Sequence, residues 1–185
     1  DQPRSRGLGD VYKRQLVDLY PGYYFVRAES AVMDAQWIPA REFALTPPKK
    51  LGKDSLLIIC SHSGKTKECL EAAKVGMDAG AAVVTMTHAP GSPCDCEEWI
   101  SVVYDWAPGV KEAQKPQGIV LDILNELMKA QEPGYTLYNS IKEGFEKIDD
   151  IIAEAVKKQQ NSAWLFAEKY SEEPMLYMMA SGASY

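Results

Sequence analysis

The sequence predicts an α/β protein built on parallel strands. Two apolar runs of strand length, residues 55–60 and 82–87, flank a helical pattern at residues 65–79. A strand, a helix and a second strand in this order form a βαβ unit, whose strands run parallel. Of the 185 residues, 46% are hydrophobic and 25% are charged, which is ordinary for a globular domain with its own core.

The segment before this βαβ unit holds one predicted strand and two predicted interruptions. Residues 23–28, Tyr-Tyr-Phe-Val-Arg-Ala, predict a strand, because aromatic and β-branched residues favour strands and Pro21-Gly22 supplies a turn ahead of it. Pro39 interrupts any continuous helix across residues 29–43. Residues 47–52 predict a turn that leads into the strand at 55–60.

The rest of the chain is predominantly helical in pattern. A short strand is predicted at residues 101–104, and a loop follows it. Apolar residues at three- and four-residue spacing predict helices at 117–130, 137–159 and 162–170. A last apolar strand is predicted at 175–180, and it runs into a Ser-Gly-Ala-Ser turn.

The loop inside the βαβ unit carries the main functional signal. It reads Ser-His-Ser-Gly-Lys-Thr and lies between an apolar strand and the start of a helix. This order directs backbone N–H groups and the positive end of the helix dipole at an anion, typically a phosphate. Ser61, Ser63 and Thr66 add hydroxyl donors, and Gly64 lets the backbone approach a ligand closely. Lys65 adds a positive charge.

Two other interpretations apply to the same loop. Ser63 or Thr66 also suits simple capping of the helix, and this alternative stays open beside the phosphate hypothesis. A nucleotide P-loop is excluded, because that motif needs a glycine five residues before the Gly-Lys pair and Ile59 stands there.

A longer pattern resembles a known family. The pattern Ser-x-Ser-Gly-x-Thr-x-Glu at residues 61–68 is followed by an alanine-rich helix, the strand at 81–87 and a Gly-Ser-Pro turn at 91–93. This resembles the sugar isomerase (SIS) domain family, which binds phosphosugars. Within it the chain is most similar to the fructosamine-6-phosphate deglycase branch, relatives of the isomerase half of glucosamine-6-phosphate synthase. The resemblance implies a three-layer α-β-α sandwich with a mainly parallel sheet, flavodoxin-like or Rossmann-like.

The resemblance also implies a function. It identifies the chain as the phosphosugar-binding portion of a sugar-phosphate isomerase or deglycase, or alternatively as a phosphosugar-sensing regulatory module without catalysis. His62 is a candidate for contact with the sugar. Catalytic residues stay unassigned, since the glutamate and histidine of similar enzymes come largely from a second domain, and no cofactor is expected. The residues implied to hold the phosphate are Ser61, Ser63, Gly64, Lys65 and Thr66.

The resemblance further implies that the chain is a fragment. Residues 1–15 are expected to be a disordered or non-native tail, and 16–130 a first SIS domain that lacks its N-terminal strand. Residues 131–174 are then a helical connector. Residues 175–185 open a second SIS domain, or their strand simply completes the first sheet. The full-length parent is expected to be a homodimer.

Charge, hydropathy and cysteine usage limit the remaining functions. The net charge of −6 gives no support for nucleic-acid binding, and no apolar run approaches the roughly 20 residues that span a bilayer. Cys60 and Cys69 fall on a predicted strand and helix, which suits reduced thiols in the cytoplasm. Cys94 and Cys96 are expected on a surface loop, without metal, because the chain has only two histidines to join them.

Overall fold

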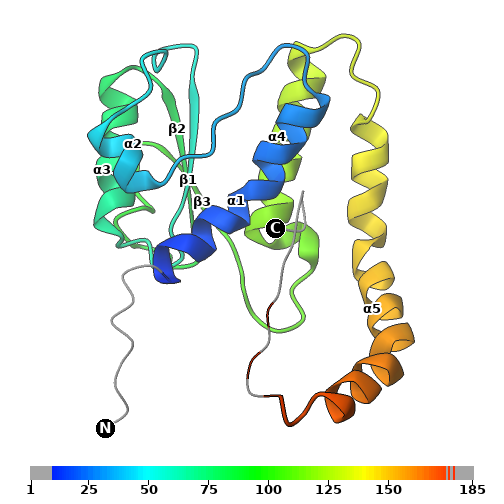
Figure 1. The fold of residues 1–185 in the computed structure, drawn as a ribbon. Helices are drawn as coiled ribbons and strands as arrows, with labels where there is room; N and C mark the ends of the chain where they lie inside the picture. The colour runs from blue at the N-terminus through cyan, green and yellow to red at the C-terminus, as the bar shows by residue number, and fades with distance from the viewer. Residues whose placement is uncertain (1–9, 174, 176, 178–185) are drawn as a thin grey trace, which may run out of the picture.

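The computed structural model describes residues 10–173, 175 and 177 (Figure 1). Within that part of the chain, three strands form one parallel sheet in the order β1-β2-β3. The strands are β1 (Leu56–Cys60), β2 (Ala82–Thr87) and β3 (Ile100–Val103). The helices are α1 (Asp10–Glu29), α2 (Ala40–Leu45), α3 (Lys67–Asp78), η1 (Glu112–Gln114), α4 (Pro116–Gln131) and α5 (Tyr138–Lys169).

Helices cover both faces of the sheet, so the predicted three-layer α-β-α sandwich is confirmed (Figure 1). On one face, Ile59 and Val83 pack against α2 and α3, with Ala73 fully buried between them. On the other face, Cys60 and Met86 pack against α1 and α4. Neighbouring residues of a strand point to opposite faces, which is why Ile59 and Cys60 belong to different cores.

The parallel register brings the three strand ends together. Cys60 pairs with Met86, and Thr87 pairs with Val103, so each strand ends at the same edge of the sheet. The loops that follow β1, β2 and β3 therefore meet at this edge. The predicted strands at 55–60, 82–87 and 101–104 and the predicted helices at 65–79 and 117–130 are confirmed with small shifts of their ends.

The strand predicted at residues 23–28 is wrong, because these residues belong to helix α1. The buried positions of α1 are Asp18, Gly22, Phe25 and Val26, a helical spacing rather than the alternation of a strand. Packing of this face on α4 outweighs the strand preference of the aromatic residues. Helix α1 also begins at Asp10, so residues 10–15 are helical and not part of the expected disordered tail.

Gly22 lies where α1 crosses α4. A Cβ atom at this position would lie 2.9 Å from Leu124 Cδ1 and 3.2 Å from Val120 Cγ2. The sequence predicted a turn at this glycine, whereas in the structure Gly22 lets two helices pack close together.

Replacing Gly22 by valine is expected to lower the free energy of unfolding by about 1–3 kcal/mol, because the branched side chain overpacks the α1–α4 contact. Urea denaturation followed by circular dichroism measures the change. The matched control is Gly144→Val on α5, where no atom lies within 4 Å of the added Cβ. Equal losses in the two variants would contradict close packing at Gly22.

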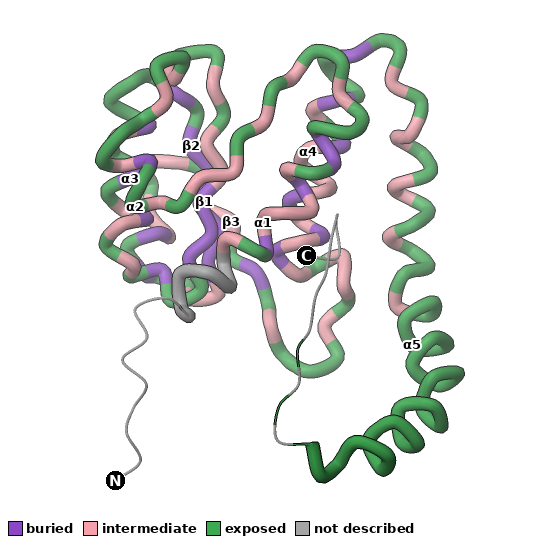
Figure 2. Tube along the Cα trace, in the orientation of Figure 1, coloured by how far each residue is buried: buried purple, intermediate pink, exposed green. Residues whose placement is uncertain are grey.

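Helix α5 joins the two helices predicted at 137–159 and 162–170 into one element of 32 residues, about 48 Å long. Its first turns contact the body of the protein. Ile141 packs beside Met128, and Lys142 forms ion pairs with Asp122 and Glu126 that raise the pKa of this lysine. Residues 150–169 are all exposed, including several large apolar side chains (Figure 2). The strand predicted at 175–180 falls mostly outside the described residues.

In the described part of the chain, the helices are each too short or too polar to span a bilayer.

Candidate functional site

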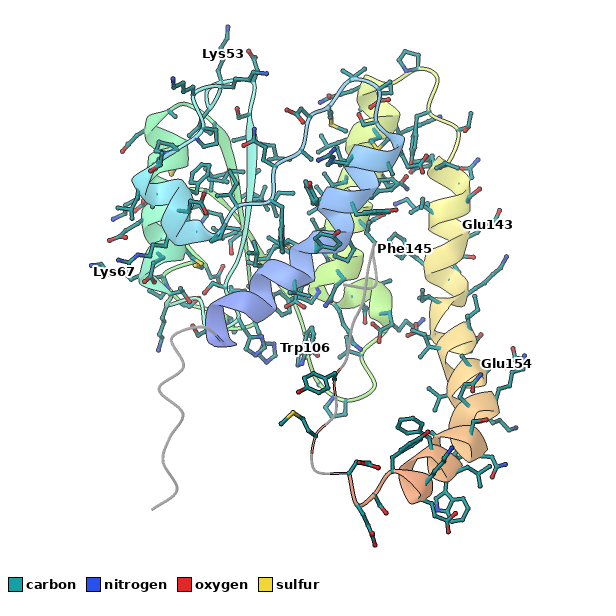
Figure 3. All side chains as sticks on the ribbon, viewed as in Figure 1. Lys53, Lys67, Trp106, Glu143, Phe145 and Glu154 are labelled. Atoms are coloured by element: carbon teal, nitrogen blue, oxygen red, sulfur yellow. The ribbon has the colours of Figure 1, made fainter. Side chains whose placement is uncertain are left out.

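The loop of residues 61–66 lies at the edge of the sheet where the parallel strands end. It connects Cys60, the last residue of β1, to Lys67, the first residue of α3. Figure 3 shows Lys67 and Trp106 at this end of the molecule and Lys53 at the opposite end. Ligands of open α/β sheets bind at the carboxyl ends of the strands, so the loop has the position of a binding site.

Gly64 has a backbone conformation and a neighbour that only glycine allows. Its φ is +62°, in the left-handed region, and a Cβ would lie 1.9 Å from Ser92 Oγ. The sequence predicted that this glycine lets the backbone approach a ligand. In the structure its open side faces Ser92, so the close approach is between two loops of the protein.

The end of β2 and the segment that follows it, residues 87–94, hold the 61–66 loop in place. The Cys94 backbone N–H donates to the Gly64 carbonyl at 3.0 Å, and the His88 N–H donates to the His62 carbonyl at 3.2 Å. The Thr87 hydroxyl donates to the same His62 carbonyl at 3.3 Å. These donors flank the Gly-Ser-Pro turn at 91–93, and Ser92 of that turn lies against Gly64, so the segment that contains the turn packs on the loop.

The predicted phosphate residues share one turn but differ in exposure. Ser63 and Lys65 are exposed, Thr66 is half-buried and Gly64 is buried. Ser61 is fully buried, and its hydroxyl donates to Thr66 Oγ1 at 3.0 Å. The Ser61 hydroxyl is thus directed at another residue of the loop.

The N-terminus of α3 has no side-chain cap from Thr66. Thr66 occupies the N-cap position, yet it makes no capping hydrogen bond. The Ser63 hydroxyl accepts a 3.4 Å bond from the Lys65 N–H, ahead of the helix. The alternative that Thr66 serves as a simple cap is therefore wrong. The positive end of the α3 dipole faces the loop.

A cluster of two imidazoles and two aromatic rings lies beside this loop. His62, His88 and Tyr104 follow the ends of β1, β2 and β3 respectively, and Trp106 lies two residues further on. The His62 and His88 rings stack, with centroids 4.8 Å apart and planes 13° apart. The Trp106 ring meets His62 edge-on at 6.1 Å.

Tyr104 connects the two imidazoles. Its hydroxyl lies 3.0 Å from His62 Nδ1, and its backbone carbonyl lies 3.0 Å from His88 Nδ1. Of these four residues, only His62 was predicted from the sequence as a site residue. A signal for the others was present, because His88 directly follows the strand predicted at 82–87 and Tyr104 ends the strand predicted at 101–104, and the ends of parallel strands share one edge.

The cysteines near the loop are buried thiols. Burial raises the pKa of Cys60 and of Cys69 to about 12 each, and it also raises the pKa of Cys94. Cys94 is 1% exposed, and its carbonyl accepts from the Thr85 hydroxyl at 2.6 Å. Its expected place on the surface is therefore wrong, while Cys96 is half-buried. Neutral thiols of this kind are poor nucleophiles.

Comparisons with known proteins find similarity to a fructosamine deglycase and to phosphosugar isomerases. No family model matches it. It is 32% identical over 167 residues to the fructosamine deglycase FrlB of Bacillus subtilis (strain 168), covering 90% of this chain and 51% of that protein. This match confirms the expected similarity to the deglycase branch.

Two solved structures share the fold. One is named a phosphosugar isomerase from Bacillus subtilis, with a TM-score of 0.83 and 31% identity over 92% of this chain and 52% of that one. The other bears the same name and comes from Salmonella typhimurium LT2, with a TM-score of 0.81 and 32% identity over 91% of this chain and 51% of that one. The chain thus spans about half the length of the relatives it matches.

Proposed function

Because the chain belongs to the sugar isomerase (SIS) domain family, we propose that it is the phosphosugar-binding portion of a sugar-phosphate isomerase or a fructosamine-6-phosphate deglycase. The loop of residues 61–66 binds the phosphate. One observation carries this proposal: the N-terminus of α3, without a side-chain cap from Thr66, faces a loop that exposes Ser63 and Lys65 at the carboxyl edge of the sheet.

The loop residues have different roles in binding the phosphate. The Ser63 hydroxyl and the Lys65 ammonium group act from the exposed side of the loop. Ser61 acts through Thr66. Its hydroxyl donates a hydrogen bond to Thr66 Oγ1, which leaves the Thr66 hydroxyl hydrogen to donate to the ligand. Hydrogen bonds to a charged phosphate are about twice as strong as those between neutral groups.

Phosphate binding serves the chemistry of the whole protein. Isomerisation of a sugar phosphate, or removal of an amine from a fructosamine phosphate, moves a proton next to a carbonyl group. Contacts with the distant phosphate orient the reacting carbons and contribute binding energy to the transition state. We assign this orienting role to the chain. We further propose a homodimeric parent in the cytoplasm, where the four free thiols remain reduced.

Replacing Ser63 by alanine is expected to weaken binding of fructose 6-phosphate about tenfold, which corresponds to one charge-assisted hydrogen bond of about 1.4 kcal/mol. Isothermal titration calorimetry measures the affinity. Ser162→Ala, at an exposed serine of α5, is the matched control and should leave the affinity unchanged. A folded wild-type chain that binds neither fructose 6-phosphate nor a fructosamine 6-phosphate would overturn the proposed function.

A further inference from the structure

Tyr104 is held rigidly at the carboxyl edge of the sheet. It directly follows β3, its side chain is 4% exposed, and it packs with Cys60, Met86 and Val120. Packing on this scale fixes the direction of the hydroxyl group. The hydroxyl therefore reaches His62 from a buried support, while His62 itself is exposed.

The hydrogen-bonding capacity of the neighbours sets the direction of the bond to His62. The Tyr104 hydroxyl lies 3.0 Å from His62 Nδ1 and 3.9 Å from Cys60 Sγ, and it has one hydrogen to donate. Sulfur is a weak acceptor and an imidazole nitrogen is a stronger one, so we assign the hydrogen to the bond with His62. Burial raises the pKa of Cys60 to about 12, so at neutral pH its sulfur is an uncharged thiol, a weak competitor of His62 for that hydrogen.

This direction determines the tautomer of His62. When Nδ1 accepts a hydrogen bond, a neutral imidazole carries its hydrogen at Nε2. The stacked ring of His88 has the opposite tautomer, because its Nδ1 lies 3.0 Å from a backbone carbonyl, which only accepts. Stacking on His88 fixes the plane of the His62 ring, and the bond from Tyr104 to Nδ1 leaves Nε2 as the ring nitrogen that can contact a ligand.

We infer that Tyr104 is a positioning residue: it holds His62 as an Nε2–H donor to an oxygen of the sugar portion of the ligand. The inference rests on the proposed phosphosugar site, since His62 lies between two residues of the phosphate loop. It separates two parts of recognition. The loop and the α3 N-terminus bind phosphate of any origin, and the Tyr104–His62 pair adds affinity only for a ligand that carries a hydroxyl or carbonyl oxygen beyond the phosphate.

The test combines Tyr104→Phe with two ligands, fructose 6-phosphate and inorganic phosphate. Calorimetry should show a three- to tenfold loss of fructose 6-phosphate affinity in this variant, with inorganic phosphate affinity unchanged. Tyr135→Phe is the matched control, because the Tyr135 hydroxyl donates to Asn125 away from the site and its loss should change neither affinity. Equal losses for both ligands in Tyr104→Phe would overturn the inference.

Nitrogen chemical shifts of the two histidines provide a readout that needs no ligand. In the wild type, His62 should show an unprotonated Nδ1 and a protonated Nε2, and His88 should show the reverse. In Tyr104→Phe the His62 signals should move towards the average of the two tautomers. A wild-type His62 protonated at Nδ1 would overturn the inference even where phosphosugar binding is confirmed. Conversely, the expected shifts without any phosphosugar binding would overturn the proposed function and the sugar contact of His62, while the tautomer that Tyr104 sets would stand.

Discussion

Replacing Gly64 by alanine is expected to abolish phosphosugar binding and to lower the free energy of unfolding by about 2–5 kcal/mol. Two costs add together. A φ of +62° is strained for any residue with a Cβ, and the new methyl group would lie 1.9 Å from Ser92 Oγ and 2.5 Å from Ser92 Cβ. Urea denaturation measures the stability, and calorimetry with fructose 6-phosphate measures the binding.

A matched glycine separates the two costs. Gly109 has a φ of +87°, and no atom lies within 4 Å of the Cβ it would gain. Gly109→Ala should therefore show the backbone cost alone, about 1–2 kcal/mol, and should keep the binding affinity. A Gly64→Ala variant that is no less stable than Gly109→Ala would contradict the close contact between the loop and Ser92.

Replacing Met86 by alanine is expected to cost about 2–5 kcal/mol of stability, because the cavity forms at a fully buried position of the central strand β2. Met86 packs with Cys60, Tyr104 and Val120, so the cavity also loosens the support of the Tyr104 hydroxyl. Denaturation midpoints in urea give the change. Met77→Ala on α3 is the control: this methionine is 39% exposed, and its loss should cost no more than about 0.5 kcal/mol. Similar losses at both positions would mean that Met86 does not anchor the core.

The βαβ unit could be predicted because its signals are local. Two apolar runs, a helical period and a hydroxyl-rich loop lie within 33 consecutive residues, 55–87, and Ile59, Ala73 and Val83 of this stretch pack in one cluster. Helix α1 could not be predicted in the same way. Its strand-like sequence becomes helical because Phe25 and Val26 pack beside Met128, a residue about 100 positions further along the chain. The role of Gly22 could not be predicted either, because it depends on contact with Val120 and Leu124 of α4, about 100 residues further along the chain.

The candidate site also has a part that local sequence predicts and a part that depends on distant contacts. The 61–66 loop follows from a contiguous motif, so its position at the strand end could be predicted. The burial of Ser61 and the contact between Gly64 and Ser92 depend on two loops meeting, which no contiguous motif records. The His62, His88 and Tyr104 cluster lies between these cases. These three residues are far apart in the sequence, yet each lies at or just after the end of a parallel strand, so the strand order is enough to predict that they are neighbours.

The hydrogen bonds between the two loops link ligand binding to folding. Ser61 donates its N–H to the Met86 carbonyl, and Cys94 donates its N–H to the Gly64 carbonyl, so the binding conformation requires β1 and β2 to be paired. The unfolded chain therefore has no equivalent site. By mass action, a ligand at 100 times its dissociation constant adds about 2.7 kcal/mol to the folded state. Under the proposed function, a phosphosugar that saturates the loop therefore raises the free energy of unfolding of the sheet itself.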